Sequence, residues 1–202
     1  MSFSVGLDIG QSNDPTALAA LENVGPPGEG RRPEYHLRHI RRFELGTPYP
    51  TIVEEVTALL AREALSDARL VVDATGVGRP IVEMLTEKGL SPYCIWITGG
   101  DSVSRDGREF RVPKRELAST VQALLQSERL KFAKGLPHRE VLVDELQKFR
   151  AKINIDTGEA SFEHWRERDT DDVVLALACA AWMEENGPGP SFQMLDAEAL
   201  GL

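Results

Sequence analysis

The chain has 202 residues, a formal net charge of −9, 42% hydrophobic residues and 27% charged residues. These values are close to the averages of globular domains, so they exclude wholesale disorder, collagen and a long coiled coil. No apolar run reaches the roughly 18 residues of a membrane-spanning helix, and the N-terminus lacks the pattern of a secretion signal. We therefore expect a cytosolic-type globular domain over residues 1–185, followed by a flexible tail over residues 186–202.

The first part of the chain alternates between short apolar runs and turn residues. The runs at 3–10 and 16–22 flank the segment QSNDP, whose composition is that of a turn, and together they predict a β-hairpin. Residues 34–45 alternate loosely and predict a third strand. Residues 51–65 carry an apolar stripe with helical spacing.

The rest of the chain predicts alternating strands and helices that close with an almost wholly apolar helix. In chain order these elements are a strand at 69–76, a helix at 78–90, a strand at 92–98, a polar loop at 99–113, a helix at 114–128, a short strand at 129–133, a helix at 138–151, a hairpin turn within 152–165 and a helix at 171–185.

This order predicts an α/β fold. Three antiparallel meander strands followed by βαβ units make a mixed sheet flanked by helices on both faces, with a small insertion before the last helix. Right-handed crossovers place the strand at 69–73 beside the first strand. Such packing brings Asp8, Asp73 and the start of the last helix together. Cys94 and Cys179 sit in apolar runs and predict buried thiols, with no disulfide framework and no zinc site.

Carboxylates stand at the ends of three apolar elements. Asp8 lies within VGLDIG, where a charge is costly unless it is paired or binds a cation; the alternative is that it caps the following turn. Asp73 ends the strand LVVDATG, a position common to many binding sites. Asp171 and Asp172 open the last helix, where capping and compensation of the helix dipole are the alternative.

The combination of these carboxylates is more informative than any one of them. Clustered carboxylates repel unless they are neutralised, and Mg²⁺ prefers oxygen ligands. Two such ions about 4 Å apart can activate water for phosphodiester hydrolysis without a side-chain nucleophile. The sequence contains no GxSxG motif, and neither cysteine is near a histidine. Residues 101–152 carry 12 Lys and Arg against 8 Asp and Glu, so a basic part accompanies the acidic one.

Five segments, in order from Val5 to Trp182, resemble the nuclease domain of tailed-phage large terminases. The segments are VGLDIGQSNDPTALAAL, LVVDATGVGRPIVEML, FRVPKRELASTVQALLQSERLKFA, ELQKFRAKI and RDTDDVVLALACAAW. The resemblance implies a ribonuclease H-like fold, close to Holliday-junction resolvases and retroviral integrases. It also implies an endonuclease that uses two divalent cations, Mg²⁺ or Mn²⁺, to cut concatemeric double-stranded DNA during genome packaging.

The resemblance also implies roles for individual residues. Asp8 corresponds to the first-strand ligand that bridges both metals, Asp73 to the second-strand ligand, and Asp172, with Asp171 beside it, to the ligand at the last helix. Asp14 corresponds to an auxiliary acid, with a turn-forming role as the alternative. His164 or Arg168 would lie near the scissile phosphate, unless they are solvated loop residues.

The sequence departs from full-length large terminases in one respect, because it has no GxxxxGK[ST] phosphate loop. The resemblance therefore implies that the packaging ATPase is another domain or another chain. It implies the small terminase and the portal as further partners, and the cytoplasm of an infected bacterium as the location.

A basic cluster predicts the path of DNA. Cations at a helix start oppose the helix dipole, so helix stability does not explain Lys114 and Arg115. We expect a phosphate-binding edge beside the acidic site, with a solvated basic loop as the alternative. The cluster comprises Arg105, Arg108, Arg111, Lys114 and Arg115.

Three other functions remain open on the sequence alone. GLDIGQS also resembles the first phosphate motif of sugar kinases and actin-like ATPases, but a second phosphate motif is missing. A non-catalytic DNA-binding or assembly module predicts that the acidic residues are dispensable. A junction resolvase predicts a preference for four-way junctions over linear duplex.

Overall fold

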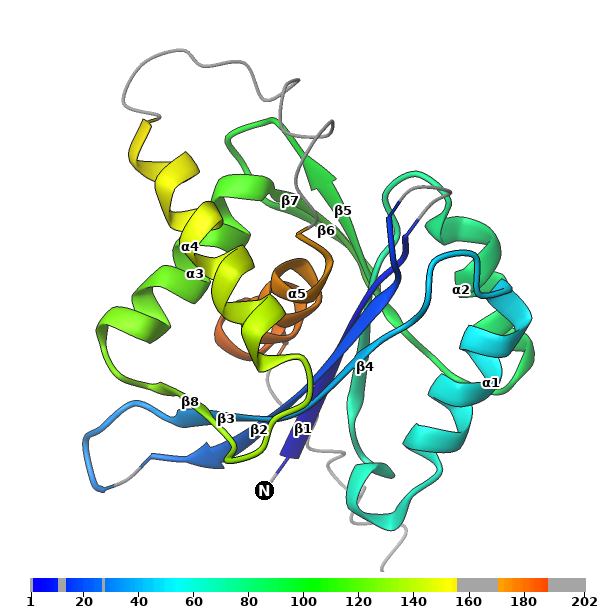
Figure 1. Cartoon of the computed structure of the whole chain (residues 1–202), viewed down its shortest axis with the longest axis horizontal. Coiled ribbons are helices and arrows are strands. Elements are labelled where there is room, and N and C mark those ends of the chain that lie inside the picture. The colour runs from blue at the N-terminus through cyan, green and yellow to red at the C-terminus, as the bar shows by residue number, and fades with distance from the viewer. Residues whose placement is uncertain (1, 11–13, 27, 156–170, 189–202) are drawn as a thin grey trace, which may run out of the picture.

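The computed structural model describes residues 2–10, 14–26, 28–155 and 171–188 (Figure 1). These residues form a mixed sheet with helices on both faces, as predicted. The elements are β1 (Ser2–Asp8), β2 (Ala17–Gly25), β3 (Glu34–Arg42), α1 (Tyr49–Leu60), the 3₁₀ helix η1 (Glu63–Leu65), β4 (Arg69–Asp73), α2 (Gly78–Glu87), β5 (Tyr93–Thr98), β6 (Ser104–Asp106), β7 (Glu109–Pro113), α3 (Lys114–Gln126), β8 (Leu130–Phe132), α4 (Arg139–Ile155) and α5 (Asp172–Asn186).

The eight strands of the sheet follow the order β6-β7-β5-β4-β1-β2-β3-β8. The meander β1-β2-β3 is antiparallel, and β4 pairs in parallel with β1. β5 and β7 extend this parallel part at one side, and β8 pairs in parallel with β3 at the other. The predicted mixed sheet, and the predicted place of β4 beside β1, are confirmed.

The polar loop predicted over residues 99–113 is wrong, because β6 and β7 form an antiparallel hairpin there. Along β7, Phe110 and Val112 are buried while Glu109 and Arg111 are exposed, which is the period-two pattern of a strand with one covered face. The turn contains Gly107 at φ 56°, and Asp-Gly is a recognised hairpin signal. The many charged residues of the segment obscured this pattern.

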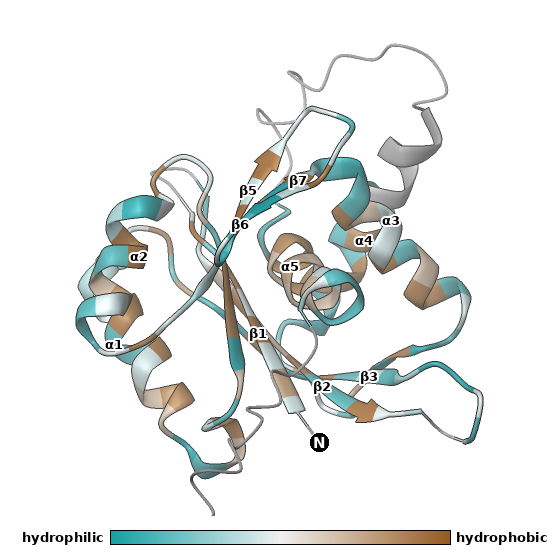
Figure 2. Ribbon diagram, turned by 180° about the vertical axis from the view of Figure 1, so that it is seen from behind, coloured by the Kyte–Doolittle hydropathy of each residue, from teal (hydrophilic) through white to brown (hydrophobic). Residues whose placement is uncertain are grey.

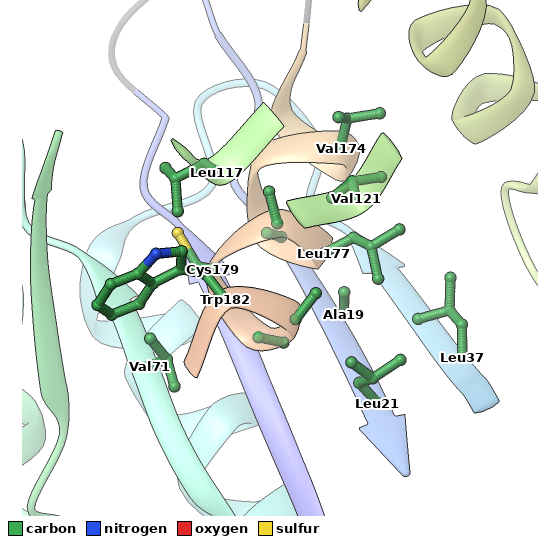
Figure 3. Close-up of a cluster of buried hydrophobic side chains, with 14 of the residues drawn as sticks. Ala19, Leu21, Leu37, Val71, Leu117, Val121, Val174, Leu177, Cys179 and Trp182 are labelled. Atoms are coloured by element: carbon green, nitrogen blue, oxygen red, sulfur yellow. The ribbon is translucent and has the colours of Figure 1, made fainter. Parts of the chain in front are cut away.

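The helices form one layer on each side of the sheet (Figures 1 and 2). α1 and α2 pack with the apolar residues of one face, including Val5, Leu7 and Val72. On the other face, α5 lies directly on the sheet, and α3 and α4 pack on α5. Figure 3 shows Val174, Leu177 and Trp182 of α5 among side chains of α3, β2 and β4. Cys94 and Cys179 are both buried free thiols, as predicted.

α5 is buried along nearly its whole length, from Asp172 to Met183. It approaches β1 so closely that a Cβ atom at Gly6 would lie 1.9 Å from the carbonyl oxygen of Ala176. At the C-terminal end of α5, Glu184 accepts hydrogen bonds from Ser4, Asn23 and Arg69. These contacts fix the position of α5 along the sheet and therefore the position of the carboxylates at its start.

In the part of the chain that the structure describes, no helix is long and apolar enough to cross a membrane. Most of the hairpin turn predicted within 152–165 and most of the tail predicted over 186–202 lie outside the described residues. Helix α5 continues to Asn186, one residue beyond the predicted end of the domain.

Candidate functional site

Asp8 and Asp73 end two neighbouring parallel strands. The register pairs Leu7 of β1 with Val72 of β4, so the residues that follow stand side by side at the carboxyl ends of these strands, the edge where α/β sheets bind ligands. Both are buried, with exposed fractions of 9% and 7%. The pairing of β1 with β4 therefore brings these two carboxylates together, as predicted.

The two carboxyl groups share a hydrogen bond, and both have raised pKa values. Burial, followed by the charges of Asp73, Asp171 and Asp172, raises the pKa of Asp8 well above its ordinary value. Burial also raises the pKa of Asp73, although hydrogen bonds from Thr75 act in the opposite direction. The backbone N–H of Thr75 donates to Asp73 Oδ1 at 2.9 Å. The pair therefore holds a proton more readily than ordinary aspartates do, which is how repelling carboxylates without a bound cation behave.

The start of α5 contributes the other two predicted carboxylates. Asp171 is the N-cap residue and Asp172 the first residue of the helix. Arg42, the last residue of β3, donates from Nε to Asp172 Oδ2 at 2.7 Å and from a terminal nitrogen to Oδ1 at 3.0 Å. This two-point ion pair holds a carboxylate whose side chain is only 2% exposed.

Lys114 lies inside the acidic cluster, not on an exposed basic edge. It is the first residue of α3, directly after β7, and its Nζ donates to Asp171 Oδ2 at 3.2 Å. Burial lowers the pKa of Lys114, while Asp171, Asp8 and Asp73 raise it. Its charge therefore faces the same carboxylates that were predicted to bind metal ions.

Glu145 of α4 belongs to this site although the sequence analysis did not identify it. Its side chain is buried, and Oε2 accepts a hydrogen bond from the backbone N–H of Val174 at 2.9 Å. Oε1 has no hydrogen-bond partner among the described residues. Burial and the charge of Asp172 raise the pKa of Glu145 to about 8. A signal was present in the sequence, because Glu145 follows Leu142 by three positions and shares its buried helix face.

The donor set has the chemistry of a site for hard divalent cations, since it consists of carboxylate oxygens. In the present arrangement, however, no group of three or more His, Cys, Asp or Glu side chains among the described residues is placed to hold a metal ion. Arg42 and Lys114 occupy oxygens of Asp172 and Asp171. A metal ion would therefore have to compete with two side-chain cations for the carboxylates of α5.

The other predicted site residues are dispersed. Asp14 is exposed between β1 and β2, and in this connection the hydroxyl of Thr16 accepts the hydrogen bond from the backbone N–H of Gly10. His164 and Arg168 lie outside the described residues.

The predicted basic cluster does not form one surface. Arg105 stacks over Phe110 and Arg108 over Tyr93, while Arg115 forms an ion pair with Asp101 at 2.6 Å. At least two separate parts of the molecule therefore hold these five residues. Lys114 lies in the acidic site, and Arg111 is exposed on β7.

Comparisons with known proteins identify the fold. No protein-family model and no curated protein matches the sequence. The structure is similar to the crystal structure of the large terminase nuclease from thermophilic phage G20c, with a TM-score of 0.55, 19% identity, and coverage of 88% of this chain and 80% of the other. It is also similar to the Mn-soaked human cytomegalovirus terminase nuclease domain, with a TM-score of 0.50, 13% identity, and coverage of 90% and 84%. The chain thus has the ribonuclease H-like fold of terminase nuclease domains.

Proposed function

We propose that this chain is a divalent-metal-dependent endonuclease that cuts double-stranded DNA during phage genome packaging. The observation that carries the proposal is the buried pair Asp8–Asp73 at the ends of β1 and β4, with Asp171 and Asp172 close enough to raise the pKa of Asp8. The terminase nuclease fold supports DNA as the substrate, and the Mn-soaked relative is consistent with a divalent cation.

Asp8, Asp73 and Asp172 are the proposed ligands of two cations, with Asp171 as a further ligand. When bound, Mg²⁺ or Mn²⁺ would supply the Lewis acid that activates water and stabilises the leaving oxygen. Asp8 lies next to Asp73, and the charges of Asp171 and Asp172 also raise its pKa. Arg42 orients Asp172 through two hydrogen bonds, and Lys114 pairs with Asp171.

The proposed partners are the DNA and the proteins that package a phage genome. Double-stranded DNA is the substrate, and a packaging ATPase domain or chain, the small terminase and the portal are the proposed protein partners, in the cytoplasm of an infected bacterium. We propose no sequence-specific recognition by this domain, because phosphate contacts carry no sequence information.

A plasmid assay tests the proposal. Supercoiled DNA is incubated with the protein and millimolar Mg²⁺ or Mn²⁺, with EDTA as the control, and nicked and linear products are measured. Asp8→Asn should reduce cleavage by orders of magnitude while the protein remains folded. Asp144→Asn is the matched control, because Asp144 is an exposed residue of α4 paired with Lys148. Equal cleavage by wild type and Asp8→Asn would show that the proposed site is wrong.

The same assay separates the two acids of α5. Asp172→Asn should cost more activity than Asp171→Asn, because Asp172 is the more buried residue. The opposite order would exchange their proposed roles.

A further inference from the structure

The buried apolar cluster beneath α1 and α2 extends across the sheet only as far as β4. The buried apolar cluster beneath these helices draws its strand residues from β1, β2 and β4, and includes no described residue of β5 or β7. On the other face, Ile95 of β5 and Phe110 and Val112 of β7 belong to the cluster around α5. On the opposite face Cys94 of β5 is still buried, whereas Trp96 of β5 is half-buried and Arg111 of β7 is exposed. This face is therefore open only toward the carboxyl ends of the two strands.

The open part of this face carries a tryptophan and an arginine, and a second arginine reaches it from α2. Trp96 of β5 alternates with the inward-facing Ile95 and Ile97, and the register pairs it with Arg111 of β7. From α2, the guanidinium of Arg79 lies 5.7 Å from the centre of the Trp96 ring. Arg79, Trp96 and Arg111 thus form a continuous row from α2 across β5 to β7, which we call the Arg–Trp face.

Neither arginine of this face is neutralised within the described structure. Arg79 and Arg111 are both exposed, and neither forms an ion pair with a described residue. By contrast, Arg115 in the first turn of α3 is paired with Asp101 of the β5–β6 connection. Glu109 is an acid on the same face of β7. It pairs with Cys94, which is two residues farther from the carboxyl end of β5 than Trp96 is. The part of the face nearest that end is therefore basic.

The Arg–Trp face borders the acidic site through a chain of hydrogen bonds. The N–H of Ile97, the residue after Trp96, donates to the hydroxyl of Thr75 at 2.8 Å. The N–H of Thr75 in turn donates to Asp73. Trp96 is therefore the neighbour in sequence of Ile97, which Thr75 links to Asp73, one of the proposed metal ligands.

We infer that the Arg–Trp face binds the sugar–phosphate backbone of duplex DNA on one side of the scissile phosphate. The cation–π contact with the ring of Trp96 holds the Arg79 guanidinium beside β5. Arg111 supplies a second phosphate contact one strand away. This inference rests on the proposed function, because it places the cleaved phosphate at Asp8 and Asp73. It assigns the DNA path to a different surface from that of Arg105 and Arg108, which lie over Phe110 and Tyr93.

Three double variants, each lacking two positive charges, test this assignment. Arg79→Ala with Arg111→Ala removes the proposed contacts. Arg105→Ala with Arg108→Ala removes the alternative path on the same hairpin. Arg31→Ala with Arg32→Ala is the control for net charge, because these exposed residues lie in the β2–β3 connection at the opposite end of the sheet. All three are made in the Asp8→Asn background, so that binding is measured without cleavage.

Affinity for a short fluorescein-labelled duplex is measured by anisotropy over a salt series. The Arg79/Arg111 variant should bind about tenfold more weakly near 0.1 M salt, and the slope of log affinity against log salt should decrease by about 2, one for each lost phosphate contact. The Arg31/Arg32 and Arg105/Arg108 variants should change much less. The inference is overturned if the Arg105/Arg108 variant loses as much as or more than the Arg79/Arg111 variant, or if all three lose the same amount.

Three further measurements keep the result unambiguous. The thermal midpoint of each variant shows whether it is folded, and Trp96→Leu in an otherwise intact chain should weaken binding less than the double change, since it frees Arg79 without removing its charge. The active-background Arg79/Arg111 variant should regain cleavage at low salt or high protein concentration. If wild type binds DNA through this face but never cuts it with Mg²⁺ or Mn²⁺, the proposed function fails while the assignment of the surface stands.

Discussion

Asp8 is a carboxylic acid in a strand whose neighbouring residues are otherwise apolar and fully buried. Val5 and Leu7 have no exposed surface, and Asp73, the nearest polar partner, is itself an acid. Such a residue reduces stability unless a cation is bound, because burial and like charge both oppose its ionised form. The molecule therefore keeps a destabilising group at the point where a metal ion would bind.

Replacing this group should stabilise the metal-free protein. In EDTA near pH 8, we expect Asp8→Asn to raise the free energy of unfolding by about 0.5–2 kcal/mol, as is common when a strained site residue is neutralised. Urea denaturation measures the change, and Asp144→Asn should stay within about 0.5 kcal/mol of wild type. A clear loss of stability in Asp8→Asn would mean that the carboxylate is satisfied without a cation.

Glu145 predicts a pH dependence. Burial raises its folded-state pKa to about 8, above the ordinary glutamate value of 4.5, so between these pH values the folded protein holds a proton that the unfolded chain has released. This contribution to stability is fully present below pH 4.5 and is lost as the pH rises toward 8. Asp8 and Asp73 act in the same direction.

Glu145→Gln should therefore flatten the decline in stability between pH 5 and 8. The amide oxygen can still accept the hydrogen bond from Val174, and the change removes at most one proton, or about 1.4 kcal/mol per pH unit of slope. Urea denaturation in EDTA at several pH values measures this slope. An unchanged slope would show that Glu145 does not titrate in this range.

At the scale of elements, the contact between β1 and α5 positions the site. The absence of a side chain at Gly6 lets the backbone of α5 approach the strand, where a Cβ would lie 1.9 Å from an oxygen of Ala176. This close approach places the start of α5 at the carboxyl ends of β1 and β4.

Gly6→Ala should consequently be strongly destabilising. The new methyl group meets backbone atoms, which cannot rotate away, so we expect a loss of about 3 kcal/mol or more, at the upper end for overpacked cores. Gly28→Ala is the control, because a Cβ there would meet nothing within 4 Å and the residue has no positive φ. Chemical denaturation of both variants gives the comparison, and similar losses would mean that α5 can shift away from β1.

The elements themselves were largely predictable from the sequence. The apolar runs of β1, β4 and β5 and the helical stripes of α1 and α3 are local patterns, and they appear where periodicity predicts them. The hairpin β6–β7 was missed because its alternation involves only a few residues within a highly charged segment.

The site was predictable only in part. Asp8 and Asp73 follow from strand ends and parallel pairing, which are rules of topology. The pairing of Arg42 with Asp172, and the arrival of Glu145 at Val174, depend on how β3 and α4 pack against α5. The spacing of Glu145 from Leu142 indicates a buried helix face, but no spacing within the sequence identifies the residues of distant elements that Glu145 and Arg42 contact.

At the scale of the whole molecule, a preformed site should couple metal binding to stability. Mn²⁺ that binds only the folded state stabilises it by about 2.7 kcal/mol at a concentration 100 times the dissociation constant. For a chain of this size, that corresponds to a rise of about 5–10 °C in the thermal midpoint. The variant with Asp8→Asn, Asp73→Asn and Asp172→Asn should show no such rise. An equal rise in both proteins would place Mn²⁺ binding elsewhere.

The close contact of Gly6 with Ala176 also has a kinetic consequence. These residues are 170 positions apart in the sequence, and α5 contacts β1, β2 and β4, all of which precede it by about 100 residues or more. Long-range contacts of this kind form slowly, because the entropy of closing a large loop must be lost before the contacts are gained. A folding intermediate in which α5 has not yet docked lacks Asp171 and Asp172 at the ends of β1 and β4. The proposed cutting activity would then arise only in completely folded molecules, so partly folded chains would not cleave the DNA around them.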